Sequence, residues 1–350
     1  MAEDFPGVDL RIGRQRIGAG VRIGPGATIV ADELVLEDGA VVDAGCDLRS
    51  ARITLAAGAQ VGANSRVLAA DGFTVGAGSR VDADADVVCR ELTVGAGTYV
   101  GCRWRVGAGA TMEERSLVTV GESCQIAPDV TFNATEPITI GAGVGISAEV
   151  AIFTHGYHAG HPVREGHPAR FEGVVVEDGV WLGLRCTVLP GVRVGAGTVV
   201  AATATVTTSL PAGVLAAGVP AKVKRPLAPE VLDEAGRREA VAALLERWLK
   251  RLEYKGLDVC PGSTGVWSVR DEVLGGWQVR APGGNGRLEV TVAGPTEDVV
   301  FDFGEPLVIR GELDVLGHDL RDFCRRSTWA FPYPLNSVGI MPRRFARLMS

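Results

Sequence analysis

The sequence predicts an all-β coil with three sides, followed by a helix and a small α+β domain. The first observation is a six-residue repeat, seen in IGAGVR (17–22), VGAGSR (75–80) and VGAGTV (194–199). The second is the loss of this repeat after Pro226, where other patterns take over. The third is an irregular stretch at 153–173 that interrupts the repeat. A fixed-period repeat is typical of stacked architectures, because each unit buries its apolar face only against its neighbours.

The aliphatic residues of the repeat come in threes, six residues apart within a triad and usually seven or eight apart between triads. The triads are Ile17, Ile23, Ile29; Leu36, Val42, Leu48; Leu55, Val61, Val67; Val75, Val81, Val87; Val94, Val100, Val106; Val120, Ile126, Phe132; Ile140, Ile146, Ile152; Val176, Leu182, Val188; and Val194, Val200, Val206. This spacing predicts one short strand and one turn per side, with each aliphatic residue stacked on its equivalent in the next coil. Neighbouring coils would then lie about 4.8 Å apart. A β-sandwich is disfavoured, because it would show a period of two.

Two inserts interrupt the coil, at 112–119 and at 153–173, and the last coil is expected to end at TTSLPAG (207–213). The longer insert holds four of the five histidines of the chain, which are His155, His158, His161 and His167. Long irregular inserts in a regular scaffold are usually functional or disordered, and clustered histidines favour function.

After Pro226 the sequence predicts a helix over 229–254, ended by Gly256. Strands are expected at 266–270, 277–281, 287–292, 299–303 and 307–315, with a turn at 283–286 and a helix in HDLRDFCRR (318–326). The predicted domains are therefore a coil domain at 1–225 with its loop at 153–173, a linker helix at 226–255, and a small α+β domain at 256–350. Trp267, Trp277, Trp329 and the segment 331–334 are interpreted as core of the small domain, or alternatively as a surface for an acceptor or carrier protein.

Composition narrows the partners and the compartment. A formal net charge of −7 argues against a nucleic-acid partner, which a basic stripe would favour. Seven cysteines without a CxxC pair, and no N-terminal signal peptide, indicate reduced thiols in a cytoplasmic protein. No apolar run reaches the roughly 18 residues of a membrane span, so no membrane partner is expected.

The segment VEDGVWLGLRCTVLPGVRVGAGTVVAATATVTTSLPAGVLAAGVPAKVKR (176–225) resembles the closing pattern of hexapeptide-repeat acyltransferases. It is most similar to the xenobiotic, galactoside and maltose O-acetyltransferase group, and the resemblance covers roughly residues 16–225. It implies a left-handed parallel β-helix, a homotrimer, and acetyl-CoA or another acyl-CoA bound in a groove between two subunits. The resemblance implies transfer of an acyl group, acetyl in that family, to a hydroxyl or amine of a small molecule such as a sugar or an antibiotic.

Direct acyl transfer needs a base, because the acceptor loses a proton as it attacks the thioester, and histidine suits this role near neutral pH. In the resembled group the catalytic histidine lies five residues beyond the last stacking aliphatic residue, a position that Tyr157 holds here. Some relatives carry T-H-x-H there, which Thr154 and His155 match in part. His155 is therefore the first candidate for the base and His158 the second.

The resemblance also suggests residues for the donor and the acceptor. For the acyl-CoA these are Trp181 at the thiol end, Lys222 and Arg225 for the phosphates, and Gly183, Leu184, Ala201, Ala202, Thr207 and Thr208 along the pantetheine arm. The sequence departs from the family pattern around Thr203 and Thr208. Asn133, Glu136 and Tyr157 are candidates for the acceptor side, and an acyl carrier protein is an alternative donor.

Two other functions stay open at this point. One is a non-catalytic β-helix scaffold, which the tyrosine at position 157 leaves possible. The other is a zinc-dependent lyase like the γ-carbonic anhydrases, suggested by the histidines at 155, 158 and 161. Three histidines at steps of three in a glycine-rich loop do not match a helical zinc motif, so no metal is expected.

Overall fold

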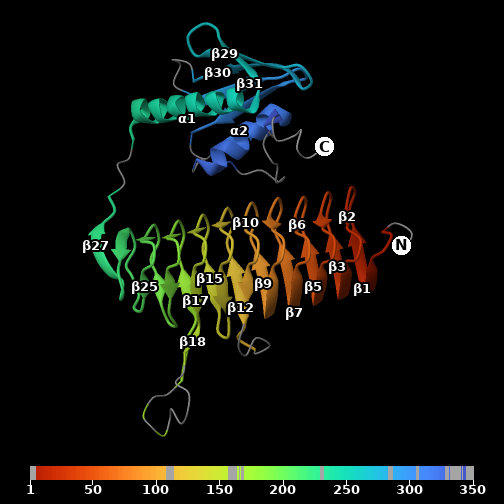
Figure 1. Cartoon of the computed structure of the whole chain (residues 1–350), viewed down its shortest axis with the longest axis vertical. Coiled ribbons are helices and arrows are strands. Elements are labelled where there is room, and N and C mark those ends of the chain that lie inside the picture. Colours follow the sequence, from red (N-terminus) through yellow and green to blue (C-terminus); the bar gives the residue numbers. More distant parts are fainter. Residues whose placement is uncertain are drawn as a thin grey trace. The chain divides into compact units, whose positions relative to one another are not determined.

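The computed structural model describes residues 5–107, 114–156, 164, 166, 169–228, 232–282, 287–304, 307–327, 331, 340 and 342–343. The chain forms two compact units that divide between Ala228 and Pro229. The first unit is a solenoid of parallel strands and the second an α+β fold, so the predicted fold class is confirmed (Figure 1).

One side of the solenoid is an eleven-stranded sheet with one short strand per coil. Its strands are β2 (Arg22–Ile23), β4 (Val41–Val42), β6 (Gln60–Val61), β8 (Arg80–Val81), β10 (Tyr99–Val100), β13 (Gln125–Ile126), β16 (Gly145–Ile146), β21 (Trp181–Leu182), β24 (Val199–Val200), β26 (Val214–Ala217) and β27 (Lys222–Pro226). Only β27 among them runs antiparallel to its neighbour. The coil therefore continues through β26, beyond the predicted end at 207–213.

The other two sides share a fourteen-stranded sheet. It consists of β1 (Asp9–Ile17), β3 (Thr28–Leu36), β5 (Asp47–Leu55), β7 (Arg66–Val75), β9 (Asp86–Val94), β11 (Arg105–Val106), β12 (Leu117–Val120), β14 (Thr131–Asn133), β15 (Ile138–Ile140), β17 (Ala151–Phe153), β20 (Val174–Val176), β22 (Thr187–Val188), β23 (Arg193–Val194) and β25 (Thr205–Val206). The first five strands are long and pass over the corner between the two sides without a turn. From β11 onward two short strands replace each long one, and the inserts begin there.

The three predicted columns of aliphatic residues are confirmed by the strand register. Leu36 pairs with Ile17 and Leu55, Val42 with Ile23 and Val61, and the same order continues to the last coil. Every member except Ile17 is buried. Burial of each aliphatic side chain in this way stabilises the folded state by about 1.5–3 kcal/mol.

A fourth buried column was not expected. It consists of Leu34, Ile53, Phe73, Leu92, Val118, Ile138 and Val174, which pair in register along the side that ends at the first column. Val118 belongs to β12, so part of the insert predicted at 112–119 is a strand of the coil. Residues 108–113 lie outside the described residues.

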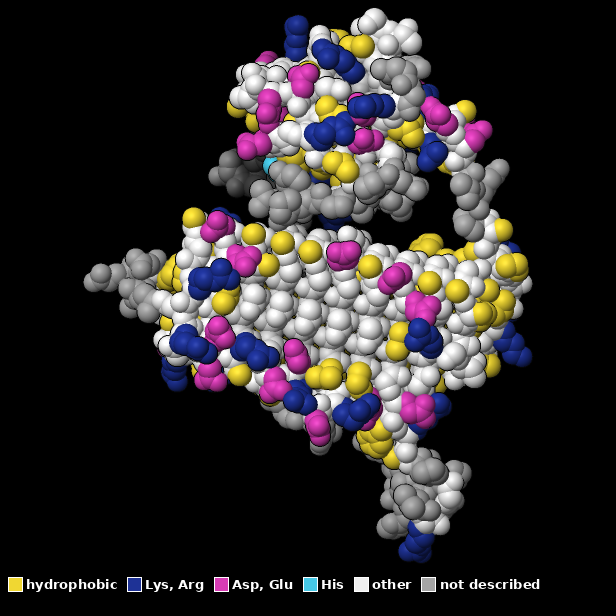
Figure 2. All heavy atoms as spheres, turned by 180° about the vertical axis from the view of Figure 1, so that it is seen from behind, with side chains coloured by type: hydrophobic (Ala, Val, Ile, Leu, Met, Phe, Trp, Pro, Cys, Tyr) yellow, Lys and Arg dark blue, Asp and Glu magenta, His cyan; other side chains and the backbone are white. Residues whose placement is uncertain are grey.

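Charged side chains avoid the broad middle of the solenoid face seen in Figure 2 and gather along its upper and lower edges. Several charged side chains of the solenoid pair between neighbouring coils, as Arg103 does with Asp129 and Arg185 with Glu149, through two hydrogen bonds each. Ion pairs therefore join neighbouring coils at the surface around the stacked core.

The second unit packs two helices and a six-stranded antiparallel sheet around one core. Its elements are α1 (Glu234–Lys255), β28 (Asp258–Pro261), β29 (Val266–Asp271), β30 (Gly275–Arg280), β31 (Glu289–Ala293), β32 (Asp298–Asp302), β33 (Val308–Arg310) and α2 (Val315–Arg326). Within the described residues, neither helix combines the length and apolar character that a membrane crossing requires.

Several predicted boundaries in this unit were wrong. The first helix begins at Glu234, because Asp233 caps it by accepting a hydrogen bond from the Gly236 N–H, and the prediction of residue 229 missed this cap. Gly256 ends the helix with φ 94°, as expected. Strand β28 was not predicted, and the strand expected at 307–315 is shorter because Asp314 caps α2. The turn at 283–286 lies outside the described residues.

Three of the aromatic residues interpreted as core of this unit do contribute to it. Trp277 and Phe331 are buried, and Trp267 packs partly buried against the same cluster. Trp329 and residues 332–334 are among those whose placement is not described.

Candidate functional site

The histidine-rich insert leaves the solenoid as a small hairpin at the end of β17. Strand β18 (His155–Gly156) pairs antiparallel with β19 (Arg170–Phe171), and Figure 1 shows this hairpin projecting from the coil. The returning chain is tied to the coil by two backbone hydrogen bonds, from the Glu172 N–H to the Thr154 carbonyl (2.9 Å) and from the Gly191 N–H to the Glu172 carbonyl (3.3 Å). The base of the insert is thus part of the ordered coil.

The Thr154 side chain connects the end of β17 to the end of β14 in the neighbouring coil. Its hydroxyl donates to the Asn133 carbonyl (2.7 Å) and accepts from the backbone N–H groups of Thr135 (2.9 Å) and Glu136 (3.0 Å). Thr154 is fully buried, so water does not compete for the hydrogen bonds of this hydroxyl. The contact holds residues 133–136 against the start of the insert.

His155 is half-buried between two side chains. Its Nδ1 atom lies 2.9 Å from the Thr135 hydroxyl oxygen, which makes a hydrogen bond. Its ring stacks on that of Phe171, with centroids 5.8 Å apart and an angle of 19° between the planes. These contacts fix both the place and the plane of the imidazole.

Thr135 is a site residue that the sequence analysis missed. The register Asn133 with Phe153 places it opposite His155, two residues further along each chain. Continuing the coil-to-coil register into the insert would have found it.

The predicted acceptor residues lie near this histidine. Asn133 is buried on β14 (Thr131–Asn133), and Glu136 follows it at the edge of the coil. The Glu136 carboxylate is 15% exposed and forms an ion pair with Arg115. An acceptor that binds Glu136 would therefore compete with a guanidinium.

Tyr157, His158, His161 and His167 lie outside the described residues. Among the residues that are described, no group of three or more histidine, cysteine, aspartate or glutamate side chains could hold a metal ion.

Trp181 lies on the eleven-stranded sheet and is 55% exposed. Its indole N–H donates to the Ser147 hydroxyl (3.1 Å), and a Cβ atom at Gly145 would lie 3.5 Å from the indole Cδ1. The ring thus covers a place where the neighbouring coil has no side chain. Beside it is a mostly apolar hollow of about 360 Å³, lined by Tyr99, Gln125, Ile126, Ala127, Pro128, Gly145, Ile146, Ser147 and Trp181.

The residues predicted along the pantetheine arm divide between two corners of the coil. Gly183, Leu184, Ala201 and Ala202 follow β21 and β24 on the side of Trp181. Thr207 and Thr208 follow β25 at the next corner, the one from which the histidine insert leaves two coils earlier. On the usual strand spacing, two coils correspond to about 10 Å along the solenoid.

Two backbone N–H groups of this wall are already used by the coil. The Gly183 N–H donates to the Val200 carbonyl and the Ala201 N–H to the Ala216 carbonyl, each at 2.8 Å. These two groups therefore do not serve as donors to pantetheine or to an oxyanion.

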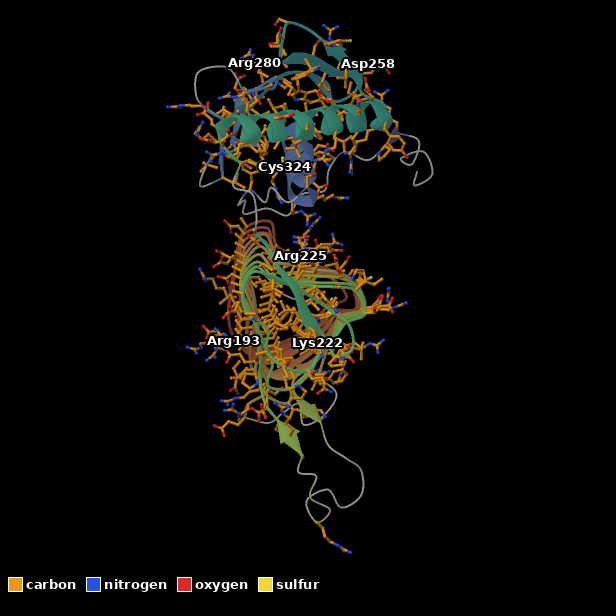
Figure 3. All side chains as sticks on the ribbon, turned by 90° about the vertical axis from the view of Figure 1, so that its left-hand side faces the viewer. Arg193, Lys222, Arg225, Asp258, Arg280 and Cys324 are labelled. Carbon is orange, nitrogen blue, oxygen red and sulfur yellow. The ribbon has the colours of Figure 1, made fainter. Side chains whose placement is uncertain are left out.

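The basic residues Lys222 and Arg225 both lie on exposed strand β27, the last strand of the sheet that carries Trp181. Figure 3 shows them at the C-terminal end of the solenoid. The sheet order β21, β24, β26, β27 places this strand about 14 Å from Trp181 on the usual spacing. Positive charge and an exposed aromatic ring therefore share one face.

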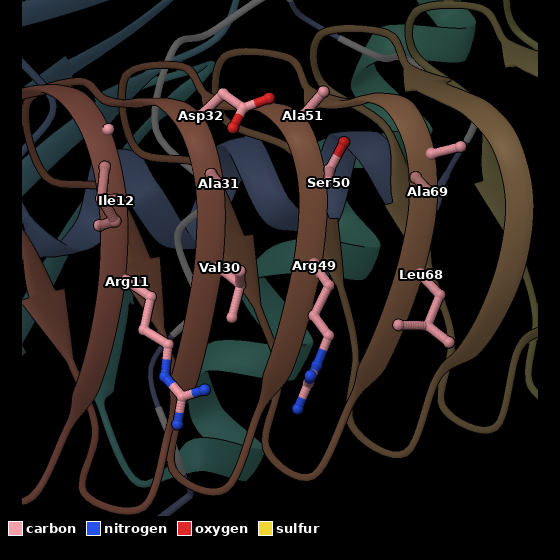
Figure 4. Close-up of a pocket in the computed structure, with 12 residues that line it drawn as sticks. Arg11, Ile12, Val30, Ala31, Asp32, Arg49, Ser50, Ala51, Leu68 and Ala69 are labelled. Atoms are coloured by element: carbon pink, nitrogen blue, oxygen red, sulfur yellow. The ribbon is translucent and has the colours of Figure 1, made fainter.

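A second hollow, of about 520 Å³, lies on the first coils (Figure 4). It is lined by Arg11, Ile12, Gly13, Val30, Ala31, Asp32, Arg49, Ser50, Ala51, Leu68, Ala69 and Ala70. Its two arginines pair with Asp9 and Asp47, and none of the predicted site residues lines it.

The stacked hexapeptides define the first unit as a hexapeptide-repeat β-helix. No family model matches the chain. The 2,3,4,5-tetrahydropyridine-2,6-dicarboxylate N-acetyltransferase of Staphylococcus aureus (strain JH9) is 48% identical over 77 residues, which are 22% of this chain and 31% of that protein. The chain thus spans about a third of the length of the curated relatives it matches. This likeness confirms the predicted resemblance to acetyltransferases.

Solved structures similar to the chain include two acetyltransferases. A hexapeptide-repeat acetyltransferase of Vibrio cholerae O1 biovar eltor, in complex with acetyl-CoA, is 28% identical and has a TM-score of 0.34, covering 39% of this chain and 71% of that one. A maltose O-acetyltransferase of Clostridium difficile 630 is 25% identical, also with a TM-score of 0.34, covering 39% of this chain and 70% of that one.

Proposed function

We propose that this protein is an acyl-CoA-dependent acyltransferase that moves an acetyl group to a hydroxyl or amine of a small molecule such as a sugar or an antibiotic. The observation that carries this proposal is His155, an imidazole held by Thr135 and Phe171 at the base of a long insert in a hexapeptide-repeat coil. The similarity of part of the chain to an N-acetyltransferase supports the same reaction class.

In the proposed reaction, the acceptor attacks the thioester carbonyl while His155 takes the proton that the acceptor loses. The tetrahedral intermediate then breaks its C–S bond, and the proton passes from the imidazolium to the departing thiolate of CoA. Electrons and protons balance without a covalent enzyme intermediate. Cys186, five residues after Trp181, is unsuited to act as a nucleophile, because burial raises the pKa of its thiol to about 12 and keeps it protonated.

The donor would lie along the eleven-stranded sheet, with its phosphates at Lys222 and Arg225 and its thiol end at Trp181. Charge-assisted hydrogen bonds to phosphate suit the two basic residues on β27. The hollow beside Trp181 would then receive the acyl group or the acceptor.

The site would be completed between subunits of a homotrimer. Within one chain, Trp181 lies on the eleven-stranded sheet, whereas the insert with His155 leaves the fourteen-stranded sheet at another corner. A groove between two copies would bring the histidine of one chain to the tryptophan wall of its neighbour.

Acetyl-CoA binding tests the donor site directly. At a concentration of about 100 times Kd, it should stabilise the folded protein by about 2.7 kcal/mol, which a thermal-shift measurement detects. An unchanged melting temperature at millimolar acetyl-CoA would favour the scaffold function instead.

Turnover of separate His155→Ala and His158→Ala variants tests the base. We expect the His155 variant to lose about a hundredfold or more in kcat, the usual contribution of a general base. The matched control is His318→Gln in the second unit, which should keep wild-type turnover. Wild-type turnover in both alanine variants would refute a histidine base at either position.

A further inference from the structure

The contact between Thr135 and His155 joins two neighbouring coils at the proposed catalytic position. The Thr135 hydroxyl oxygen lies 2.9 Å from His155 Nδ1, and Thr135 itself is only 5% exposed. A hydroxyl can donate to an imidazole nitrogen or accept from its N–H, so the direction of this hydrogen bond decides which ring nitrogen carries the proton.

The position of Thr135 is set by backbone contacts rather than by His155. Its N–H donates to the Thr154 hydroxyl (2.9 Å), and that hydroxyl is bound in turn to the Asn133 carbonyl (2.7 Å). Because Thr154 precedes His155 directly, one buried hydroxyl fixes the backbone on both sides of the contact. The Thr135 oxygen therefore offers a preformed partner for the imidazole.

We infer that Thr135 is a positioning residue that accepts a hydrogen bond from His155 Nδ1–H and so assigns the basic lone pair to Nε2. This inference rests on the proposed function, and it adds which nitrogen acts and what orients it. Proton transfer from the acceptor would take place at Nε2, on the side of the ring away from Thr135.

The chemistry of the reaction favours this direction of the hydrogen bond. When Nε2 takes the acceptor proton, the imidazolium keeps its Nδ1–H, and the Thr135 oxygen goes on accepting it without rearrangement. If the hydroxyl instead donated to Nδ1, the neutral ring would carry its proton on Nε2 and could not act as a base there. Phe171 adds to the restraint, since its ring stacks on the imidazole and limits rotation about the side chain.

The test compares Thr135→Val, which keeps the branched shape without the hydroxyl, with Thr135→Ser, which keeps the hydroxyl. The tautomer of His155 is observed by NMR of the full-length protein with 15N-labelled histidine, and the His155→Gln spectrum assigns its signals. We expect the Nδ1-protonated form in the wild type and in Thr135→Ser. Thr135→Val should shift toward the Nε2-protonated form that free imidazole side chains favour in water.

Kinetics of the same variants give the second readout. Thr135→Val should lower kcat about tenfold or more while the KM for acetyl-CoA changes less than about twofold, because a positioning residue acts on proton transfer and not on donor binding. Thr135→Ser should restore most of the rate. Thr139→Val, on an exposed threonine of β15, is the matched control for this exchange and should behave like the wild type.

The inference is overturned if wild-type His155 carries its proton on Nε2, or if Thr135→Val keeps wild-type kcat. A wild-type protein that shows the Nδ1 tautomer but transfers no acyl group from any acyl-CoA would refute the proposed function and the catalytic role of Thr135 with it. The tautomer measurement separates these outcomes, because it does not depend on activity.

Discussion

At the scale of single residues, the corners of the coil place the clearest restriction on backbone conformation. The corner after the eleven-stranded sheet places one residue per coil in the left-handed region, and several of these are not glycine: Asn64, Asp84, Arg103, Asp129, Glu149, Arg185 and Thr203. Most are polar residues that tolerate this conformation or gain a cross-coil ion pair. Thr203, with φ 60°, is the β-branched exception.

Replacing Thr203 by glycine should therefore stabilise the solenoid by about 0.5–1 kcal/mol, because the strain of a β-branched residue exceeds the entropy that glycine loses on folding. The backbone hydrogen bond from the Thr203 N–H to the Leu184 carbonyl (2.7 Å) is kept by the variant. The urea midpoint of the β-sheet circular dichroism signal measures the change.

Thr205→Gly is the matched control, because Thr205 lies in the extended strand β25. Glycine at that position should destabilise the solenoid by about 0.5–1 kcal/mol. Equal destabilisation by both variants would show that the corner at Thr203 stores no strain.

At the scale of elements, a buried ion pair connects the two helices of the second unit. Asp319 of α2 forms an ion pair with Lys255 at the end of α1, and these side chains are 1% and 4% exposed. The same carboxylate accepts hydrogen bonds from the Trp248 indole N–H (2.9 Å) and the Ile340 backbone N–H (2.5 Å). Burying two charges is tolerated because these donors replace water around the carboxylate.

Asp319→Asn should destabilise the second unit by about 3–5 kcal/mol, because it leaves the Lys255 ammonium buried without its counter-charge. The double variant Lys255→Met with Asp319→Asn should recover much of this loss, because it removes the buried charge and keeps an oxygen acceptor at position 319. Chemical denaturation followed by tryptophan fluorescence reports on Trp248, which lies directly at the contact.

The exposed pair Arg238 and Glu234 of α1 provides the comparison, since Glu234→Gln should cost less than about 0.5 kcal/mol. A loss of similar size in Asp319→Asn would mean that the buried pair contributes no more than a surface one.

At the scale of the whole molecule, we propose an active site that lies between two chains. His155 and Trp181 lie on different sheets of one solenoid, so an active site at a subunit interface would need the insert of one copy and the wall of the next. An active site between two chains predicts that two different impaired variants can complement each other, whereas a site within one chain does not.

Mixing His155→Ala with Trp181→Ala subunits, each of which we expect to have strongly reduced activity alone, should restore activity. Random assembly of equal amounts into trimers gives about a quarter of the interfaces one intact histidine and one intact tryptophan. Co-expression with two different affinity tags isolates the mixed oligomers, and acetyl transfer is measured on them.

Two inactive parents whose mixed oligomers stay inactive would place both residues in one chain's site, or outside the site altogether. Light scattering of the wild type supplies the number of subunits, for which three is expected.

The amino-acid pattern alone is enough to predict the coil, its three stacked columns, and the place where the insert leaves it. A strictly periodic structure repeats one local environment, so the same aliphatic positions recur at fixed steps and can be counted. The end of the coil was less predictable, because Ala216 continues the column with a small residue in place of a larger aliphatic one. The second unit has no such repeat, and β28 and the capped ends of its helices were predicted less well.

The contacts that give the candidate site its chemistry depend instead on how neighbouring coils align. Thr135 contacts His155, and the Gly183 and Ala201 N–H groups donate to carbonyls of the next coil, because parallel coils bring residues about 15 to 20 positions apart into direct contact. Periodicity says which side chains point inward, but hydrogen bonds between coils require the register and the turn geometry. Asp319 shows the same limit in the second unit, because its donors come from α1, which holds Trp248 and Lys255, and from Ile340, and they meet the carboxylate only in the folded protein.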